Sequence, residues 1–299
     1  MLVTTCAICL TDTHDREVYP ANFCREDLNP EVFSARRLPD RLHYRMVICR
    51  QCGLMRANPV LSPDALSVLY AQSHGHHEQL SQAAAETYAR YFQENFSPFP
   101  AEGRVLEIGC GPGPFLKELM RQNYRNLHGV EPSREACEQA GELKGLIYNG
   151  MFSGSIYPKD YFDVICAFQM FDHLSDPGQF LKDCRENLKP EGSLFLILHN
   201  IKALPARVLG RSCPMIDIEH PILYQPETIV KVLEANGFEV KKSFSVINRY
   251  PLIYWLQLIP LPLNLKKTLL GFFQKTAIGN MPVTLGLGNM GIIARKKDK

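Results

Sequence analysis

Residues 105–115 read VLEIGCGPGPF, and this stretch decides the fold. Its apolar start predicts a buried strand, and its glycines predict a sharp turn at which a ligand can approach the bare backbone. The sequence FLKELMRQ that follows has the apolar spacing of a helix. A strand, a glycine-rich turn and a helix in this order predict an α/β domain that binds a nucleotide-like ligand at the end of the strand.

Two carboxylates, Glu107 and Glu131, indicate which chemical groups the ligand at this turn carries. Glu107 lies inside the end of the buried strand, where a carboxylate is costly unless a cation or a donor meets it. The amino group of a methionine moiety would be such a partner. Glu131 ends the next strand and can accept both hydroxyls of a ribose. A nicotinamide fingerprint, GxGxxG, fits less well because Pro114 occupies the place of its third glycine.

From Gly103 onward, strand-like runs alternate with helix-like runs. Such alternation predicts a parallel sheet with helices on both faces. We expect a helix over residues 78–96 and another in PETIVKVLEANG, where Pro226 begins the helix and Gly237 follows its end. The expected strands lie in VLEIG, LHGVEP, FDVICAF, SLFLIL, FEVKKSFSV and GIIARK.

Four of these segments, in this order, resemble the class I S-adenosylmethionine-dependent methyltransferases. VLEIGCGPGPF and Glu131 are similar to the family's first motif and the acidic position after it. FDVICAFQMFDHLSDP looks like its fourth strand and the following loop, LKPEGSLFL like the turn into its fifth strand, and HPILYQPETIVKVLEANGFEV like its late helix and strand. The resemblance implies an α/β, Rossmann-like, seven-stranded methyltransferase sheet over residues 101–299, with S-adenosylmethionine as cofactor.

The resemblance also implies a set of cofactor-binding positions. Met151 or Phe152 is expected to pack on the adenine, since no acid follows the third strand to receive the adenine amino group. The full expected set is Glu107, Gly109, Cys110, Gly111, Gly113, Glu131, Met151, Phe152 and Gln169.

Two CxxC pairs lie in the first sixty residues. They are CAIC, with Cys6 and Cys9, and CRQC, with Cys49 and Cys52. Four thiolates in two such pairs can surround one Zn²⁺ ion tetrahedrally, so we predict a structural zinc site. A metal-free reduced module or an iron–sulfur cluster are the alternatives. We therefore predict a small zinc ribbon over residues 1–60 and a helical linker or lid over residues 61–100.

This front end resembles the N-terminal module of a methyltransferase subgroup that includes sugar C-methyltransferases. The resemblance implies a small-molecule acceptor, namely a sugar, a nucleotide-linked sugar or a related glycan or natural-product intermediate. Glu219 and His220 resemble a Glu-His pair that serves acid–base chemistry in those enzymes. His220, His173 and Glu219 are therefore the candidate catalytic residues. A structural role for His173, holding the loop over the cofactor, and for His220 stays open.

An apolar insertion precedes the last strand, at about residues 251–280. One interpretation is a helical cover over the substrate pocket. The other is a peripheral contact of residues 251–275 with a membrane or a lipid-linked substrate.

The overall composition excludes some classes of function. The formal net charge is only +2, which gives no support for a surface that coats nucleic acid. The start of the chain lacks the basic and apolar regions of a signal peptide, so we expect a cytoplasmic protein. Two alternatives to a small-molecule enzyme remain: an RNA methyltransferase that grips its substrate with the zinc module, and a non-catalytic zinc-ribbon interaction protein.

Overall fold

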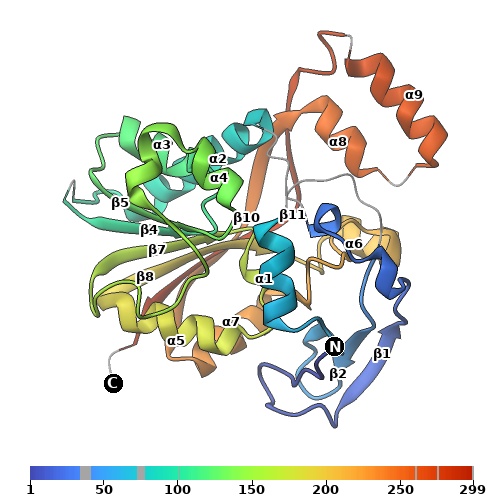
Figure 1. Ribbon diagram of the computed structural model, residues 1–299, viewed down its shortest axis with the longest axis horizontal. Helices are drawn as coiled ribbons and strands as arrows, with labels where there is room; N and C mark the ends of the chain where they lie inside the picture. The colour runs from blue at the N-terminus through green and yellow to red at the C-terminus, as the bar shows by residue number, and fades with distance from the viewer. Residues whose placement is uncertain (34–41, 73–77, 101, 260, 275, 298–299) are drawn as a thin grey trace.

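The computed structural model describes residues 1–299 except 34–41, 73–77, 101, 260, 275 and 298–299. Its largest element is a seven-stranded sheet in the order β10-β11-β8-β7-β4-β5-β6 (Figure 1). The strands are β4 (Arg104–Ile108), β5 (Asn126–Glu131), β6 (Ile147–Asn149), β7 (Phe162–Phe168), β8 (Leu188–His199), β10 (Phe238–Pro251) and β11 (Pro282–Lys296).

The sheet is mixed. Strands β6, β5, β4, β7 and β8 are parallel neighbours, whereas β11 runs antiparallel to both β8 and β10. Helices cover both faces, because the central strands are buried on both sides and must be shielded from water. This architecture confirms the predicted α/β fold.

Each face of the sheet has its own apolar core. The first core joins the sheet to the buried sides of α5 and α7, and the second joins it to α2 and α3. The helices are α1 (Pro63–Ala71), α2 (Glu78–Phe96), α3 (Pro114–Arg121), α4 (Arg134–Gln139), α5 (Pro177–Asn187), α6 (Leu204–Leu209), α7 (Pro226–Ala235), α8 (Leu252–Leu258) and α9 (Leu263–Gln274). Short 3₁₀ turns are η1 (Arg25–Asp27), η2 (Pro30–Phe33), η3 (Gly141–Leu146), η4 (Phe171–His173) and η5 (Gly210–Ser212). The span of α2 agrees with the predicted helix over residues 78–96.

A second, four-stranded sheet has the order β1-β2-β3-β9. Strands β1 (Asp15–Tyr19), β2 (Met46–Cys49) and β3 (Met55–Ala57) come from the start of the chain, but β9 (Ile222–Leu223) comes from beyond β8. Met55 pairs with Leu223, and Arg56 pairs with Ile222. The N-terminal module is therefore completed by a late segment of the chain, which the sequence did not reveal.

The insertion before the last strand forms two helices, α8 and α9, that extend beyond the end of the β10–β11 hairpin (Figure 1). The hairpin is longer than predicted and pairs from Phe238 with Lys296 to Pro251 with Pro282. None of the helices in the described part of the chain has the length and apolar character that a membrane crossing requires.

Candidate active site

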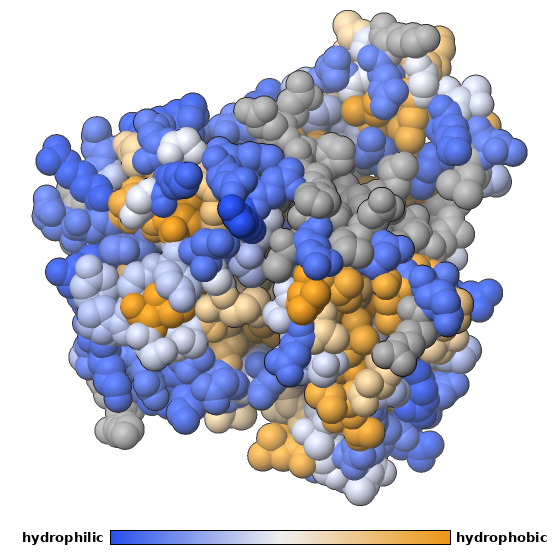
Figure 2. Space-filling view, in the orientation of Figure 1, coloured by the Kyte–Doolittle hydropathy of each residue, from blue (hydrophilic) through white to orange (hydrophobic). Residues whose placement is uncertain are grey.

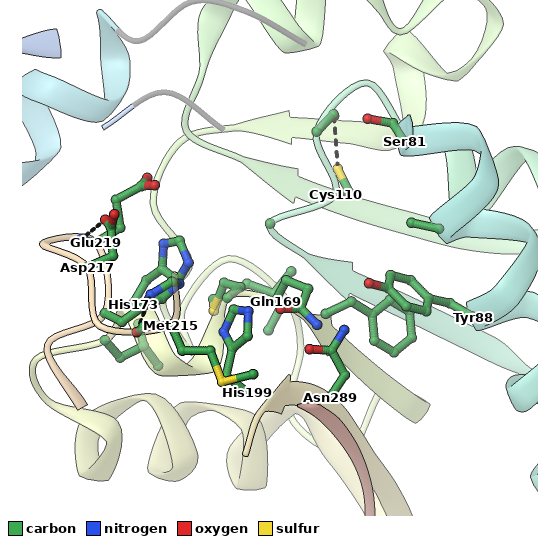
Figure 3. A pocket seen from close by; sticks show the side chains of 18 of the residues that line it. Ser81, Tyr88, Cys110, Gln169, His173, His199, Met215, Asp217, Glu219 and Asn289 are labelled. Atoms are coloured by element: carbon green, nitrogen blue, oxygen red, sulfur yellow. Dashed lines mark hydrogen bonds between the residues drawn. The ribbon is translucent and has the colours of Figure 1, made fainter. Parts of the chain in front are cut away.

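A cavity of about 1140 Å³ lies at the carboxyl ends of the parallel strands. The glycine-rich turn after β4 and the end of β5 line one end of this cavity. A group of histidines, the β10–β11 hairpin, α6 and α8 line the other. We call these the nucleotide end and the acceptor end; Figure 3 shows Cys110 at the first and His173 and His199 at the second.

The turn after β4 depends on its glycines. Gly109, Gly111 and Gly113 have φ values of 74°, 54° and 81°, in the left-handed region that favours glycine. Gly109, Cys110 and Gly111 line the cavity, whereas Gly113 does not. A Cβ added at Gly113 would lie 2.6 Å from the side chain of Leu143, so this glycine permits close packing. Pro114 follows as the first residue of α3, a position that suits proline.

Glu107 is buried, with 5% of its surface exposed. Its Oε2 atom accepts no hydrogen bond from any described residue. Burial, together with the nearby charge of Glu131, raises the pKa of the Glu107 carboxyl well above its usual range. A buried carboxyl oxygen without a donor at the wall of a cavity fits a ligand that brings an ammonium group.

Glu131 is held by the backbone. Its Oε2 accepts a hydrogen bond from the Gly111 amide at 2.8 Å, and its Oε1 accepts one from the Ser133 amide at 2.8 Å. Burial raises the pKa of Glu131, and these two amide donors oppose that rise. Each carboxylate oxygen has a further lone pair, so Glu131 can also accept the two hydroxyls of a ribose.

The remaining predicted cofactor residues also line the cavity. Met151 is 56% exposed, and Phe152 packs edge-on against Phe180 with ring centroids 5.7 Å apart. Gln169 has a φ of 52°, and its Nε2 atom donates to no described residue. An amide donor held in a strained backbone conformation beside a cavity is typical of a ligand-binding position.

The three predicted catalytic residues all line the acceptor end. The rings of His173 and His220 lie 4.9 Å apart, edge to face. His220 Nδ1 lies 3.1 Å from the carbonyl oxygen of Met215. Burial and the neighbouring His220 lower the pKa of His173 to about 3. Glu219 follows on the same loop, and its amide donates to Asp217 Oδ1 at 3.1 Å.

A fourth polar side chain here was missed from the sequence. His199, the last residue of β8, lies with its ring 4.6 Å from that of His220. Its Nδ1 is 2.6 Å from Oδ2 of the fully buried Asp172. The available signal was position, since the carboxyl ends of parallel strands carry ligand-binding groups. Asn248 and Asn289, from the β10–β11 hairpin, also line the cavity and were not foreseen.

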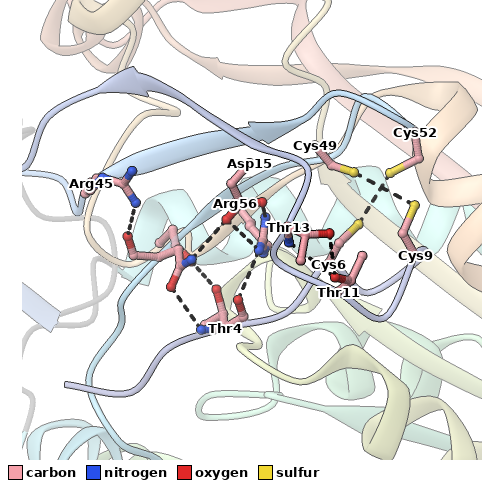
Figure 4. A network of polar contacts seen from close by, with 12 residues as sticks. Thr4, Cys6, Cys9, Thr11, Thr13, Asp15, Arg45, Cys49, Cys52 and Arg56 are labelled. Carbon is pink, nitrogen blue, oxygen red and sulfur yellow. Dashed lines mark hydrogen bonds and ion pairs between the residues drawn. The ribbon is translucent and has the colours of Figure 1, made fainter.

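The four predicted zinc ligands come together outside this cavity (Figure 4). All four sulfur atoms lie within 4.8 Å of one another, with Cys6 and Cys52 at 3.4 Å and Cys9 and Cys49 at 3.8 Å. All are free thiols. Two CxxC pairs clustered in this way have the donor set of a tetrahedral Zn²⁺ site.

A buried ion pair stabilises the sheet beside these cysteines. Arg56, 1% exposed, makes two bonds to Asp15, at 2.7 Å and 2.9 Å (Figure 4). Asn58 donates to Asp15 as well, at 3.0 Å. The guanidinium also donates to the carbonyl of Thr4 at 3.0 Å, so the segment that carries Cys6 is tied to β3.

A seven-stranded mixed sheet with an acid-flanked glycine turn defines a class I S-adenosylmethionine-dependent methyltransferase. The sequence matches a methyltransferase-domain family over residues 76–243, which is more than half of the chain. The chain belongs to this family.

Curated proteins with similar sequences include two ubiquinone biosynthesis O-methyltransferases. A ubiquinone biosynthesis O-methyltransferase of Bradyrhizobium diazoefficiens is 28% identical over 172 residues, which cover 53% of this chain and 68% of that protein. One from a Shewanella species is 24% identical over 157 residues, covering 48% and 66%. The chain thus spans about two thirds of these relatives. They are named O-methyltransferases, and not sugar C-methyltransferases.

A solved structure supports the fold alone. A protein of Bacillus halodurans C-125 described as a methyltransferase superposes with a TM-score of 0.50 at 13% identity, covering 70% of this chain and 99% of that one.

Proposed function

We propose that this protein transfers the methyl group of S-adenosylmethionine to a hydroxyl oxygen of a small, largely apolar acceptor. The observation that carries the proposal is the single cavity that joins a nucleotide-binding turn to a group of imidazoles. Methyl transfer needs the acceptor oxygen in line with the sulfonium and a group to take its proton, and the two ends of the cavity can supply these.

At the nucleotide end, each predicted residue has a role that its surroundings support. Glu107 would bind the methionine ammonium through its unsatisfied Oε2, and Glu131 the ribose hydroxyls. Phe152 and Met151 would pack on the adenine ring. The backbone of residues 109–111 and the Gln169 amide would line the remainder, while Gly113 shapes the turn.

At the acceptor end, the imidazoles of His173, His199 and His220 line the cavity, where an imidazole could receive the proton of a bound hydroxyl. Neutral imidazole suits this task near physiological pH. Glu219 and the 6%-exposed Asp217 are placed to accept further acceptor hydroxyls. The binding of S-adenosylmethionine brings the chemical reactivity, and these residues orient the acceptor and hold its proton.

The acceptor end is lined mainly by apolar side chains, and they support an acceptor with an apolar body. Leu204 and Val208 of α6 are 70% and 71% exposed, and Ile259 after α8 is 43% exposed. Figure 2 shows apolar surface gathered on this face, over the region of α1 and α6. Since the curated relatives are named O-methyltransferases of ubiquinone biosynthesis, a catechol with an alkyl substituent is the acceptor class we favour. The remaining lining residues include Leu66, Leu209, Tyr254, Trp255, Leu258 and Leu287.

A sugar or nucleotide-linked sugar is the second candidate acceptor. The observation in its favour is the pair of carboxylates, Asp217 and Glu219, beside His220 in the cavity wall. Carboxylates are good acceptors for sugar hydroxyls. The resemblance of the N-terminal module to that of sugar C-methyltransferases supports the same candidate.

The N-terminal residues 1–60 would form a zinc-bound module, with Cys6, Cys9, Cys49 and Cys52 as ligands. Their clustering supports zinc. Residues 61–100 would serve as the linker and lid, and residues 101–299 as the catalytic domain. None of the ten cysteines, all within the described residues, forms a disulfide, and this supports a location in the reducing cytoplasm.

The segment at residues 251–275 would cover the acceptor end. Tyr254, Trp255 and Leu258 of α8 line the cavity, which supports the cover. A peripheral membrane contact would use the 65%-exposed Phe272 and the 49%-exposed Leu265 of α9. The net charge of +2 supports neither an RNA substrate nor a nucleic-acid partner.

Calorimetry followed by methyl transfer tests the proposal. We expect micromolar binding of S-adenosylmethionine, a range in which about 8 kcal/mol of binding free energy is involved. Labelled cofactor should then transfer its methyl group to alkylated catechols and not to a nucleotide-linked sugar. Binding without transfer to any catechol, sugar or RNA would support the non-catalytic interaction protein, and absence of binding would overturn the proposal.

A further inference from the structure

His199 and Asp172 form a dyad at the acceptor end. Asp172 lies in η4 after β7, and its side chain is fully buried. Its Oδ2 is 2.6 Å from His199 Nδ1 and also accepts a hydrogen bond from the His199 backbone amide at 3.1 Å. These two contacts fix both the strand end and the imidazole ring against one carboxylate oxygen.

The dyad also sets which ring nitrogen carries the proton. Burial alone would raise the pKa of Asp172, but the facing imidazoles, His199 above all, hold it far below its usual range. An ionised carboxylate can only accept, so His199 Nδ1 carries the hydrogen. The lone pair of neutral His199 is therefore on Nε2, and the His199 side chain is 21% exposed and lines the cavity.

We propose that His199, oriented by Asp172, is the catalytic base, in place of the His220 that the sequence suggested. The proposal rests on the proposed methyl transfer to a hydroxyl. His199 Nε2 takes the hydroxyl proton as the oxygen bonds to the methyl carbon. The carbon–sulfur bond breaks and its electron pair stays on sulfur. Asp172 acts as a positioning residue that stabilises the imidazolium until the proton leaves to solvent.

The two neighbouring imidazoles are less suited to this task. Both His199 and His220 lie near Asp172, but it is His199 Nδ1 that lies at hydrogen-bond distance, 2.6 Å, from its carboxylate oxygen, whereas His220 Nδ1 lies 3.1 Å from the carbonyl oxygen of Met215. His173 is disfavoured as a base because burial and His220 lower its pKa to about 3. The titratable groups that face His199 are Asp172 and His173 from η4, and His220 and Asp217 from the loop before β9.

Single-turnover methylation of an alkylated catechol by His199→Ala, His220→Ala and Asp172→Asn tests the proposal. His14→Ala, which removes an exposed imidazole that does not line the cavity, is the matched control. We expect His199→Ala to lose roughly 10²–10⁴-fold in rate, the range for a positioned base, with unchanged Kd for S-adenosylmethionine. His220→Ala should lose less. The reverse order, or a His199→Ala variant with normal rate, would overturn the proposal.

Asp172→Asn separates positioning from mere structural support. An Asn side chain keeps the shape of Asp172 but carries no charge and can donate through its Nδ2, so His199 Nδ1–H loses its anionic acceptor. We expect a lower rate of methyl transfer, an unchanged Kd for S-adenosylmethionine and a smaller fraction of the Nδ1–H tautomer of His199. A lower rate with an unchanged tautomer would overturn the role of Asp172.

Nitrogen-15 NMR of the histidine rings tests the His199–Asp172 contact directly, even if the protein methylates no catechol. The proposal requires the Nδ1–H tautomer of His199, and an Nε2–H tautomer would overturn it. If the protein binds S-adenosylmethionine, shows the Nδ1–H tautomer and methylates only a sugar, the acceptor class fails while the dyad survives, and the same variants are then measured with that sugar.

Discussion

The two ends of the cavity are built in different ways. Most of the nucleotide end comes from one continuous unit, β4, the glycine turn, α3 and β5, so its acids are only 24 positions apart along the chain, at Glu107 and Glu131. The acceptor end combines η4, the end of β8, the loop before β9, the β10–β11 hairpin and α8. A site built from one continuous segment can be predicted from a sequence motif. A site whose residues come together only through tertiary packing has no such motif.

The largest effect expected is on the stability of the N-terminal module. Its strand β3 pairs with β9, which follows His220 of the acceptor end. If the four cysteines bind zinc as we propose, the Cys6→Ser/Cys49→Ser double variant should lose this ion and much thermal stability, since structural zinc contributes about 10–16 kcal/mol of binding free energy in zinc-finger peptides. Metal analysis and thermal unfolding measure both. Cys24→Ser, at an exposed cysteine outside the cluster, is the control. Full zinc content in the double variant would contradict the assignment.

Glu107→Gln is expected to act on the nucleotide end alone. Loss of a charge-assisted hydrogen bond of about 1.5–3 kcal/mol should raise the Kd for S-adenosylmethionine roughly 10- to 100-fold. Calorimetry measures this, with the exposed Glu86→Gln as a matched control. If Glu107→Gln binds S-adenosylmethionine as tightly as the wild type does, another residue binds the ammonium group. The nucleotide end would then depend on residues outside the β4–β5 unit.

A smaller effect concerns the stability of the ligand-free protein. Burial raises the pKa of Glu107 in the folded state. Protonation of Glu107 therefore contributes to the free energy of unfolding, fully at pH values below the pKa that Glu107 has in the unfolded chain. This contribution is lost as the pH rises through the folded-state pKa. Denaturant unfolding of the wild type should therefore show stability declining over this window, and Glu107→Gln should decline less, since the buried Glu131 still titrates in both proteins. A parallel decline in both proteins would assign the effect to another group.

The smallest effect is expected from Leu258→Ala at the acceptor end. Leu258 of α8 lines the cavity, and removing its Cγ and two methyl groups costs about 0.8 kcal/mol for each buried carbon that contacted the acceptor. The KM for an alkylated catechol should rise several-fold, and the Kd for S-adenosylmethionine should not change. A change confined to S-adenosylmethionine would show that α8 covers the nucleotide end instead.

The sequence predicted those parts whose signals are local. The strand β7, the helix α2 and the clustering of the four cysteines followed from periodicity and spacing. His199 was missed because a lone histidine after an apolar strand has no pattern of its own, and its partner Asp172 lies 27 residues earlier. Gly113 was expected at the cofactor but packs against Leu143, a contact that only the tertiary structure defines.

The pairing of β3 with β9 has a consequence for folding during synthesis of the protein. Strands β1, β2 and β3 are synthesised before the strand that completes their sheet, Ile222–Leu223, which follows β3 by more than 160 residues. Gln225, just beyond β9, also donates to the Gly53 carbonyl beside the cysteines, at 3.5 Å. Until β9 is synthesised, the backbone N–H and C=O groups at the edge of β3 have no strand partner. Such an exposed edge can pair with strands of other chains and cause aggregation. If the cysteines bind zinc as we propose, early binding of the ion would stabilise the fold of the nascent segment until β9 is synthesised.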